Sequence, residues 1–331
     1  MASDIVTFGA AGFPGVNRTL ESVQACTGMT SHYQLSSNDA HGPELEFYAQ
    51  IMRQRKPLLI LFGGWCSLYA AMIARLRNND FRFGVWWLST AGQTDMSADV
   101  ERFTEAIEHP RVRYFGCAQK SLAKSLAVRA EGVAYLPVPM DPAEFNPRPN
   151  RLRGPTVLSL FCSPHEYRRK NIMNTLLAVA NLDDEYLLFL NGLSRATPYR
   201  RLLRSLKVRY LDWGWMSDGA YRRALNQVDI GLQLSFTESF NQVSAEHMAR
   251  SIPVLASSLV PAMAAVRKED RHRLIVDSPE DSNAIRDRLQ WLIRHPEARL
   301  RMGRRASAQL RDLSVKNADI ARRVLRAWIQ R

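Results

Sequence analysis

Short apolar runs recur along the chain, separated by stretches long enough to form helices. In the first 140 residues these runs fall at 4–8, 57–62, 83–88, 112–115 and 133–136. Strands that are short and apolar throughout are typical of a parallel sheet buried on both faces. Helical patterns follow residue 64 and cover 121–129. The alternation therefore predicts an α/β fold with helices on both sides of the sheet.

The same pattern restarts after a proline-rich segment, 142–155, which has four prolines and one glycine and is expected to be a linker. Beyond it, strands are predicted at 156–161, 186–190, 208–211, 228–234, 253–257 and 274–276. Helices are predicted at 171–182, 218–227, 242–250 and from 281 onward. A chain of this length is also long for one hydrophobic core. We expect two doubly wound, Rossmann-like domains facing a cleft, residues 1–150 and 151–331, with the last helices free to pack back on the first domain.

Composition describes a globular protein, with 46% hydrophobic and 23% charged residues. No apolar stretch approaches the roughly 18 residues that a membrane span needs. The first residues lack a basic region followed by an apolar core, so no secretory signal is expected. The four cysteines have no paired spacing, which argues against a zinc site or a disulfide framework. A cytoplasmic protein is expected, with peripheral attachment to a membrane surface left open.

The second half of the chain carries the whole net charge of +13. Residues 1–150 hold 14 Lys/Arg and 14 Asp/Glu, whereas 151–331 hold 31 and 18. Within that half, 286–331 carries 13 basic and 4 acidic residues. Such a charge favours a partner with phosphate groups, a nucleic acid or an anionic membrane among them. A solvated, Arg-rich helical face explains the tail equally well.

Two glutamates define the most informative segment, 228–257, with the sequence VDIGLQLSFTESFNQVSAEHMARSIPVLAS. It resembles the donor-binding core of the group 1 family of retaining glycosyltransferases, which have the two-domain GT-B architecture. That family shows a strand, a loop, two glutamates separated by seven residues, a helix and a Pro-Val strand. Here the glutamates are Glu238 and Glu246, and the next strand opens at Pro253. The resemblance covers about residues 110–330 and fades in the first hundred.

The resemblance implies that Glu238 contacts the sugar of a nucleotide-sugar donor. Glu246, inside the predicted helix, offers two acceptor oxygens to the two hydroxyls of a ribose. The helix start between them favours an anionic diphosphate. This donor-binding loop comprises Ser239, Phe240, Asn241 and Gln242. The alternative interpretation is a capping glutamate followed by an exposed helical one.

Three cations follow the strand predicted at 156–161. Arg168, Arg169 and Lys170 precede a predicted helix, where positive charge is opposed by the helix dipole. A bound phosphate would compensate that charge. The family uses an arginine and a lysine here to neutralise the leaving diphosphate, which implies this role for Lys170 and for Arg169 or Arg168. A solvated basic turn is the alternative.

Other positions extend the expected donor site. Asn241 occupies the position where the family has a glycine. Its side chain is expected to reduce the space near the diphosphate. Gly12 lets the backbone approach the donor phosphates or simply forms a tight turn. Asn191 falls where the family's loops surround the nucleotide base. Trp213 and Trp215 do so as well, and are expected either to stack on the base or to pack in the core.

No Asp-x-Asp pair is present, so a metal clamp on the diphosphate is not expected. Charge on the leaving group must then be met by Lys170, an arginine and helix N-termini. His247 shows no pattern typical of a catalytic histidine and is expected to pack within its helix. No cofactor is expected beyond the nucleotide sugar, which is a co-substrate.

The sequence predicts an enzyme that moves a sugar from a nucleoside-diphosphate sugar to an acceptor hydroxyl, with retention implied by the resemblance. A glycan, a lipid-linked sugar or a small molecule bound to the first domain is the expected acceptor. Two alternatives remain open. One is a DNA-modifying glycosyltransferase that acts on a hydroxylated base, as some phage enzymes do. The other is a non-catalytic nucleic-acid-binding α/β protein.

Overall fold

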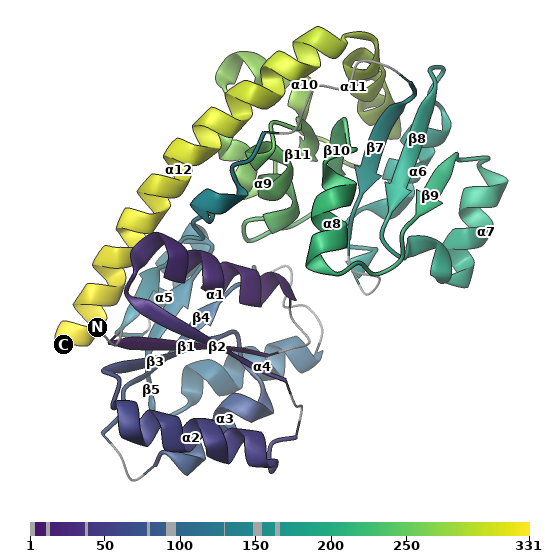
Figure 1. Ribbon diagram of the computed structural model, residues 1–331. Helices are drawn as coiled ribbons and strands as arrows, with labels where there is room; N and C mark the ends of the chain where they lie inside the picture. The colour runs from purple at the N-terminus through teal and green to yellow at the C-terminus, as the bar shows by residue number, and fades with distance from the viewer. Residues whose placement is uncertain are drawn as a thin grey trace. The chain divides into compact units, whose positions relative to one another are not determined.

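The chain divides into two compact units, the first formed by Met1–Pro142 and Leu313–Arg331 and the second by Ala143–Asp312. Each is built on a parallel sheet (Figure 1). The computed structural model describes residues 4–10, 14–36, 39–77, 80–90, 97–128, 130–147, 154–162 and 166–331.

Within the described residues, the sheet of the first unit has the strand order β2-β1-β3-β4-β5-β6. Its strands are β1 (Ile5–Ala10), β2 (Thr30–Leu35), β3 (Leu59–Gly63), β4 (Phe83–Trp87), β5 (Val112–Cys117) and β6 (Val133–Tyr135). β1, β3 and β4 are buried along their whole length, as expected of central strands. The apolar pattern predicts all of these strands except β2, whose polar residues lie partly exposed at the edge of the sheet.

Helices cover both faces of this sheet. They are α1 (Pro14–Thr27), α2 (Pro43–Arg55), α3 (Ser67–Arg75), α4 (Ser97–Glu108) and α5 (Lys120–Ala127). Figure 1 shows α1 on one side of the strands and α2 and α3 on the other. One core cluster joins Phe8, Phe62 and Phe83 of the sheet to Met52 of α2 and Tyr69 of α3. Gly12 lies outside the described residues.

The sheet of the second unit has the order β12-β11-β10-β7-β8-β9 within the described residues. Its strands are β7 (Thr156–Leu160), β8 (Tyr186–Leu190), β9 (Tyr210–Asp212), β10 (Ile230–Gln233), β11 (Val254–Ser257) and β12 (Ile275–Val276). Every neighbouring pair is parallel. The apolar pattern places each of these strands to within about two residues, and both halves of the chain are α/β as predicted.

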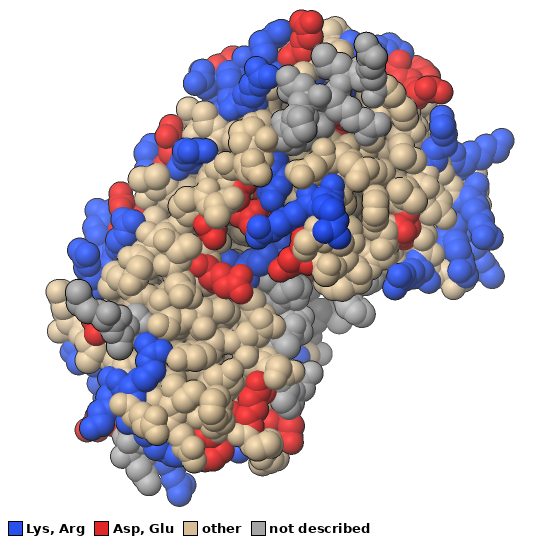
Figure 2. Space-filling model, viewed as in Figure 1, with Lys and Arg blue, Asp and Glu red and all other residues tan. Residues whose placement is uncertain are grey.

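The helices of the second unit are α6 (Ile172–Ala180), α7 (Thr197–Ser205), α8 (Asp218–Leu225), α9 (Gln242–Ala249), α10 (Arg271–Leu274) and α11 (Ser282–Arg294). The apolar pattern does not predict α7, because Leu203 is its one fully buried side chain and three of its nine residues are arginines. Figure 2 shows Lys and Arg gathered over this helix. Arg200, Arg201 and Arg204 are exposed there.

The final helix, α12 (Pro296–Gln330), is 35 residues long and contributes to both units. Beyond residue 312 it packs on the first unit. The Asn317 amide donates to the carbonyl of Val138 at 2.9 Å, and the Ser314 hydroxyl donates to the carbonyl of Met140 at the same distance. Trp328 is buried and stacks on Tyr114, with ring centroids 5.3 Å apart.

Several arginines of the basic tail have partners inside the protein. Arg305 pairs with Asp270, and Arg322 donates to the carbonyl of Cys26 at 2.7 Å. Arg299 is buried. Along α12, Figure 2 shows basic and acidic residues interspersed. Much of the charge predicted to meet a polyanion therefore serves packing. Among the described residues, no helix has the length and apolar character needed to cross a membrane.

Candidate functional site

The predicted site residues lie at the carboxyl edge of the second sheet. β7, β8 and β10 are neighbours in a parallel sheet, so the loops after them open at the same edge, where α/β folds bind ligands. The Asn191 side chain, after β8, accepts a hydrogen bond from the Cys162 N–H, after β7, at 2.9 Å. At the end of β10, the Gln233 amide donates to the carbonyl of Phe161 at 3.0 Å. These contacts fix the three loops against one another.

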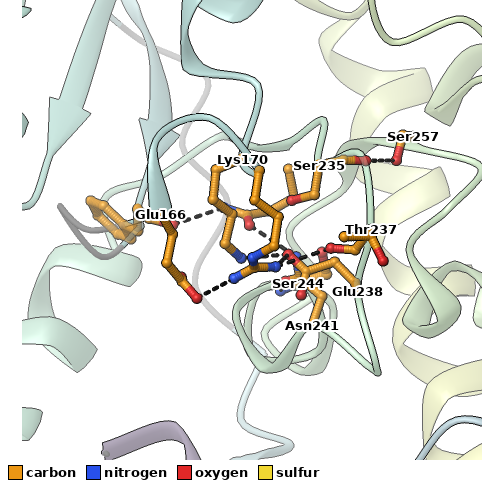
Figure 3. Close-up of polar contacts among 11 residues, drawn as sticks. Glu166, Lys170, Ser235, Thr237, Glu238, Asn241, Ser244 and Ser257 are labelled. Atoms are coloured by element: carbon orange, nitrogen blue, oxygen red, sulfur yellow. Dashed lines mark hydrogen bonds and ion pairs between the residues drawn. The ribbon is translucent and has the colours of Figure 1, made fainter. Parts of the chain in front are cut away.

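A buried carboxylate and two cations form the centre of this edge (Figure 3). The Oε1 atom of Glu238 lies 2.6 Å from Lys170 Nζ and 2.8 Å from an Arg169 guanidinium nitrogen. Arg169 also pairs with Glu166 and donates to the carbonyl of Thr237 at 3.0 Å. Only 5% of Glu238 is exposed. Two acids and two bases thus compensate one another inside the protein.

Both Glu238 and Arg169 are ionised at neutral pH. Burial raises the pKa of the Glu238 carboxyl, but the charges of Lys170 and Arg169 outweigh burial and hold that pKa below its usual range. Burial lowers the pKa of the Arg169 guanidinium, and the charges of Glu238 and Glu166 raise it by more. The cluster is therefore a fixed arrangement of full charges with little access to water.

The three cations directly precede a helix, as predicted. α6 begins at Ile172, and Asn171 before it has a left-handed backbone with φ 54°. Carboxylates of the protein also pair with Arg169 and Lys170, so the charge of these two residues does not by itself require a bound phosphate. Arg168 is exposed, as the alternative of a solvated basic turn requires.

Asn241 opens α9 with a left-handed backbone, φ 70°. Glycine adopts this region freely and asparagine at small cost, which explains why either residue suits the position. The Asn241 Oδ1 atom accepts the Ser244 N–H at 2.8 Å, and the amide donates to Gln233 Oε1 at 3.0 Å. Asn241, and not Glu238, therefore caps the helix. Its side chain is committed to these two contacts.

The remaining residues of the predicted loop surround this cap. Phe240 is buried and its carbonyl accepts the Ala262 N–H at 3.0 Å, while Ser239 and Gln242 are half-buried. The N-terminus of α9 thus lies four residues after Glu238, and its dipole adds partial positive charge to the edge.

Glu246 lies inside α9 and is only 3% exposed. Its Oε2 atom accepts a hydrogen bond from the Tyr221 hydroxyl of α8 at 2.6 Å. A buried carboxylate is costly unless hydrogen bonds compensate the lost hydration. The alternative of an exposed helical glutamate is therefore wrong for this residue.

Asp212, at the end of β9, is a part of the site that sequence reasoning missed. It accepts hydrogen bonds from the N–H groups of Gly192, Ser194 and Gly214 at 2.6 to 2.8 Å, and one from the Ser194 hydroxyl. Burial raises its pKa, but these four hydrogen bonds lower it by more. Asp212 thus ties the loop that contains Asn191 to the loop after β9.

The tryptophans of the loop after β9 are exposed, Trp213 by 41% and Trp215 by 60%. Trp213 makes an edge contact with Phe189, at 5.7 Å between ring centroids. The expectation that they pack in the core is wrong for both. Both rings are therefore open to contact with a ligand.

His247 is fully buried and hydrogen-bonded at both ring nitrogens. Its Nδ1 atom donates to the carbonyl of Val243 at 2.7 Å, and its Nε2 atom lies 2.7 Å from the Ser159 hydroxyl of β7. It packs within its helix as predicted. In the part of the chain that the structure describes, no group of three His, Cys, Asp or Glu side chains is arranged to hold a metal ion.

Comparison with known proteins agrees with this fold. Residues 147–309 match the family model described as glycosyl transferases group 1. The structure is similar to sucrose-phosphate synthase from Thermosynechococcus elongatus, with a TM-score of 0.70, 14% identity, and 98% of this chain and 99% of that one covered. It is also similar to HepE from Anabaena in complex with UDP and glucose, with a TM-score of 0.72, 13% identity, and 98% of each chain covered. A glycosyltransferase from Rickettsia africae gives a TM-score of 0.66 at 13% identity, with 97% and 98% covered. No curated protein sequence matches the chain.

The two parallel sheets and these structural similarities show the GT-B fold. The match of residues 147–309 indicates a glycosyltransferase. More particularly, the second unit carries a group 1 glycosyltransferase domain.

Proposed function

We propose that the enzyme transfers a sugar from a nucleoside-diphosphate sugar to an acceptor hydroxyl, and that the site around Glu238 holds the donor. The observation that carries the proposal is the contact of Lys170 and Arg169 with this one buried carboxylate, beside the N-terminus of α9. Cations and a helix dipole in a site with little water are suited to the charge that develops on a departing diphosphate.

Each site residue has a role in this proposal. Lys170 and Arg169 meet the diphosphate, while Glu238 accepts a hydroxyl of the sugar and keeps both cations in place. Glu246 accepts the ribose hydroxyls. The loop that Asp212 organises, with the exposed Trp215, lies against the base. Arg168, Asn191, Ser239, Phe240, Asn241 and Gln242 complete the donor site in the second unit.

Uridine diphosphate is the first nucleotide to test, since the similar HepE structure contains UDP and glucose. We further propose transfer with retention of the anomeric configuration, supported by the group 1 resemblance. In that chemistry the leaving phosphate deprotonates the acceptor on the same face of the sugar. Lys170 and Arg169 stabilise the negative charge of the leaving group in this proposal. A glycan, a lipid-linked sugar or a small molecule is the proposed acceptor.

A donor screen tests the proposal. UDP, GDP and ADP are each added at increasing concentration, and the melting temperature is measured. A nucleotide at a hundred times its dissociation constant stabilises the folded state by about 2.7 kcal/mol. One nucleotide is expected to raise the melting temperature of the wild type and to lose this effect in Glu246→Gln. Glu297→Gln, which alters an exposed glutamate of α12, is the matched control. If none of the three nucleotides raises the melting temperature, the donor site is wrong and the non-catalytic alternative gains.

The basic surface of α7 supports an additional anionic partner. Its exposed arginines have no counterpart of opposite charge on the same helix, whereas α12 also carries Glu297, Asp312 and Asp319. Binding of duplex DNA or of anionic vesicles should then fall steeply with salt. Replacing Arg200, Arg201 and Arg204 by glutamate should abolish this binding. Binding that survives the replacement would contradict the assignment.

A further inference from the structure

Glu144 lies where the chain enters the second unit, which begins at Ala143. Its carboxylate contacts two arginines from different parts of that unit. One oxygen accepts a hydrogen bond from Arg222 of α8 at 2.6 Å, and the other accepts one from Arg250, directly after α9, at 3.0 Å. Of the Glu144 side chain, 15% is exposed. A single carboxylate therefore connects α8 to the end of α9.

The two contacts of this clasp, formed by Glu144, Arg222 and Arg250, differ in burial. The Arg250 side chain is 6% exposed and also donates to the carbonyl of Glu246, one turn back in α9, at 3.4 Å. A charge buried to this extent needs a partner of opposite sign, which Glu144 provides. The Arg222 side chain is 57% exposed, so water screens its ion pair. The link to α8 is therefore expected to change an equilibrium by a few-fold and not by orders of magnitude.

α8 contains the residue that hydrogen-bonds to Glu246. Tyr221 is adjacent to Arg222 in this helix, and its hydroxyl donates to Glu246 Oε2 at 2.6 Å. Two of the eight side chains of α8 are buried, whereas α9 is buried throughout 244–249. A helix as short as α8 has little stability of its own, so its neighbours set its position. The clasp and the Tyr221 hydroxyl thus both join α8 to the better-buried α9.

We propose that Glu144 is a positioning residue for the donor site: it holds α8 against α9, so that the Tyr221 hydroxyl stays on Glu246. The carboxylate then keeps one orientation toward the ribose hydroxyls, and less conformational freedom is lost when the nucleotide binds. Glu144 acts on the donor through Glu246 alone. The inference rests on the proposed function and deepens it, because affinity for the ribose then depends on a residue outside the donor site.

Binding of two nucleotides to the full chain tests the inference. The ligands are UDP and 2′,3′-dideoxy-UDP, which lacks both ribose hydroxyls, and their affinities are measured by calorimetric titration or, where binding is weak, by ligand-observed NMR. Glu144→Gln should weaken binding of UDP about 3–10-fold and change binding of the dideoxy compound by less than about twofold. A merely structural role would change both affinities alike or change neither.

Two further variants complete the experiment. Glu144→Asp keeps the negative charge beside Arg250 but is one methylene shorter, so it should reach one arginine and not both. It replaces Glu144→Gln if that variant folds poorly, and it should weaken binding of UDP in the same selective way. Glu185→Gln is the matched control, because Glu185, directly before β8, forms an exposed ion pair with Arg209 in the same unit. This control should change neither affinity.

Equal changes in the affinities for UDP and dideoxy-UDP, or no change in either, would overturn the inference. The melting temperature of the wild type with UDP is measured in the same series. If UDP stabilises the wild type but not Glu246→Gln, while the Glu144 variants show no selectivity, the donor site stands and Glu144 does not position it. If UDP, GDP and ADP all fail to stabilise the wild type, the proposed function itself has failed.

Discussion

Replacing Glu238 by glutamine separates the contribution of the charge cluster to stability from its proposed contribution to diphosphate binding. The change keeps the shape of the side chain and removes its charge, so Lys170 and Arg169 lose the carboxylate that lies within 2.8 Å of both. Removing one partner of a buried ion pair costs about 3–5 kcal/mol. For a protein of this size each kcal/mol lowers the melting temperature by about 2–4 °C. Without nucleotide, Glu238→Gln should therefore melt about 6–20 °C below the wild type.

UDP should reverse much of this loss if the two cations face a diphosphate. The nucleotide brings negative charge to cations that the variant leaves uncompensated, so UDP should bind Glu238→Gln about tenfold more tightly or better, a gain of about 1.4 kcal/mol. UDP-glucose should gain less than UDP, because its sugar loses an acceptor at the same position. Differential scanning fluorimetry and calorimetric titration measure both quantities.

Glu166→Gln is the matched control for this experiment. Glu166 pairs with the same arginine, but 38% of its side chain is exposed. Exposed ion pairs contribute about 0–1 kcal/mol, so the melting temperature should fall by little. If UDP stabilises Glu238→Gln no more than it stabilises the wild type, the cations do not meet the diphosphate and the donor geometry proposed here is refuted.

Further substitutions test other parts of the site. The stability that Glu238 contributes should be complete above the unfolded carboxyl pKa of about 4.3 and lost as the pH falls through the lower folded value. Acid titrations of wild type and Glu238→Gln should therefore converge only below that folded value. Lys170→Ala should lower kcat about 10²–10³-fold, measured as release of UDP in the presence of acceptor. A fall in donor affinity with unchanged kcat would contradict that role. Glu246→Gln should weaken donor binding by about 1.5–3 kcal/mol, roughly 10- to 150-fold by calorimetry, with the fold retained by circular dichroism. Asn241→Ala should cost about 2–4 kcal/mol in urea unfolding, from the lost cap and the left-handed backbone, whereas Asn241→Gly should cost only a few tenths; equal losses would mean that the backbone conformation is not what selects the residue.

The alternation of apolar runs was enough to predict the strands of both sheets, because a strand buried on both faces needs little else in its sequence. The pattern fails where burial is partial. β2 lies at a sheet edge with polar residues, and α7 buries one leucine beneath a row of arginines. Such elements are held by their neighbours in space, which hydrophobic periodicity along the chain does not report.

The same limit applies to the site. The sequence places Glu238, Glu246 and the three cations in their loops and helix, but not the contacts among them. Lys170 and Glu238 are 68 residues apart, so their ion pair is invisible to local pattern. The helix-dipole argument for a bound phosphate therefore did not take this ion pair into account. The sequence does not indicate the role of Asp212, because an aspartate at the end of a strand is common. Only the structure shows the four hydrogen bonds that it accepts.

The sharing of α12 between the units has a practical consequence for any shortened version of the protein. The matched glycosyltransferase segment ends at residue 309, and the second unit extends only three residues further. A chain cut there would retain every residue proposed to hold the donor. It would also uncover the surface of Tyr114 that Trp328 protects and remove the partners of the Val138 and Met140 carbonyls. Nucleotide binding would survive, while the other half of the enzyme would tend to aggregate.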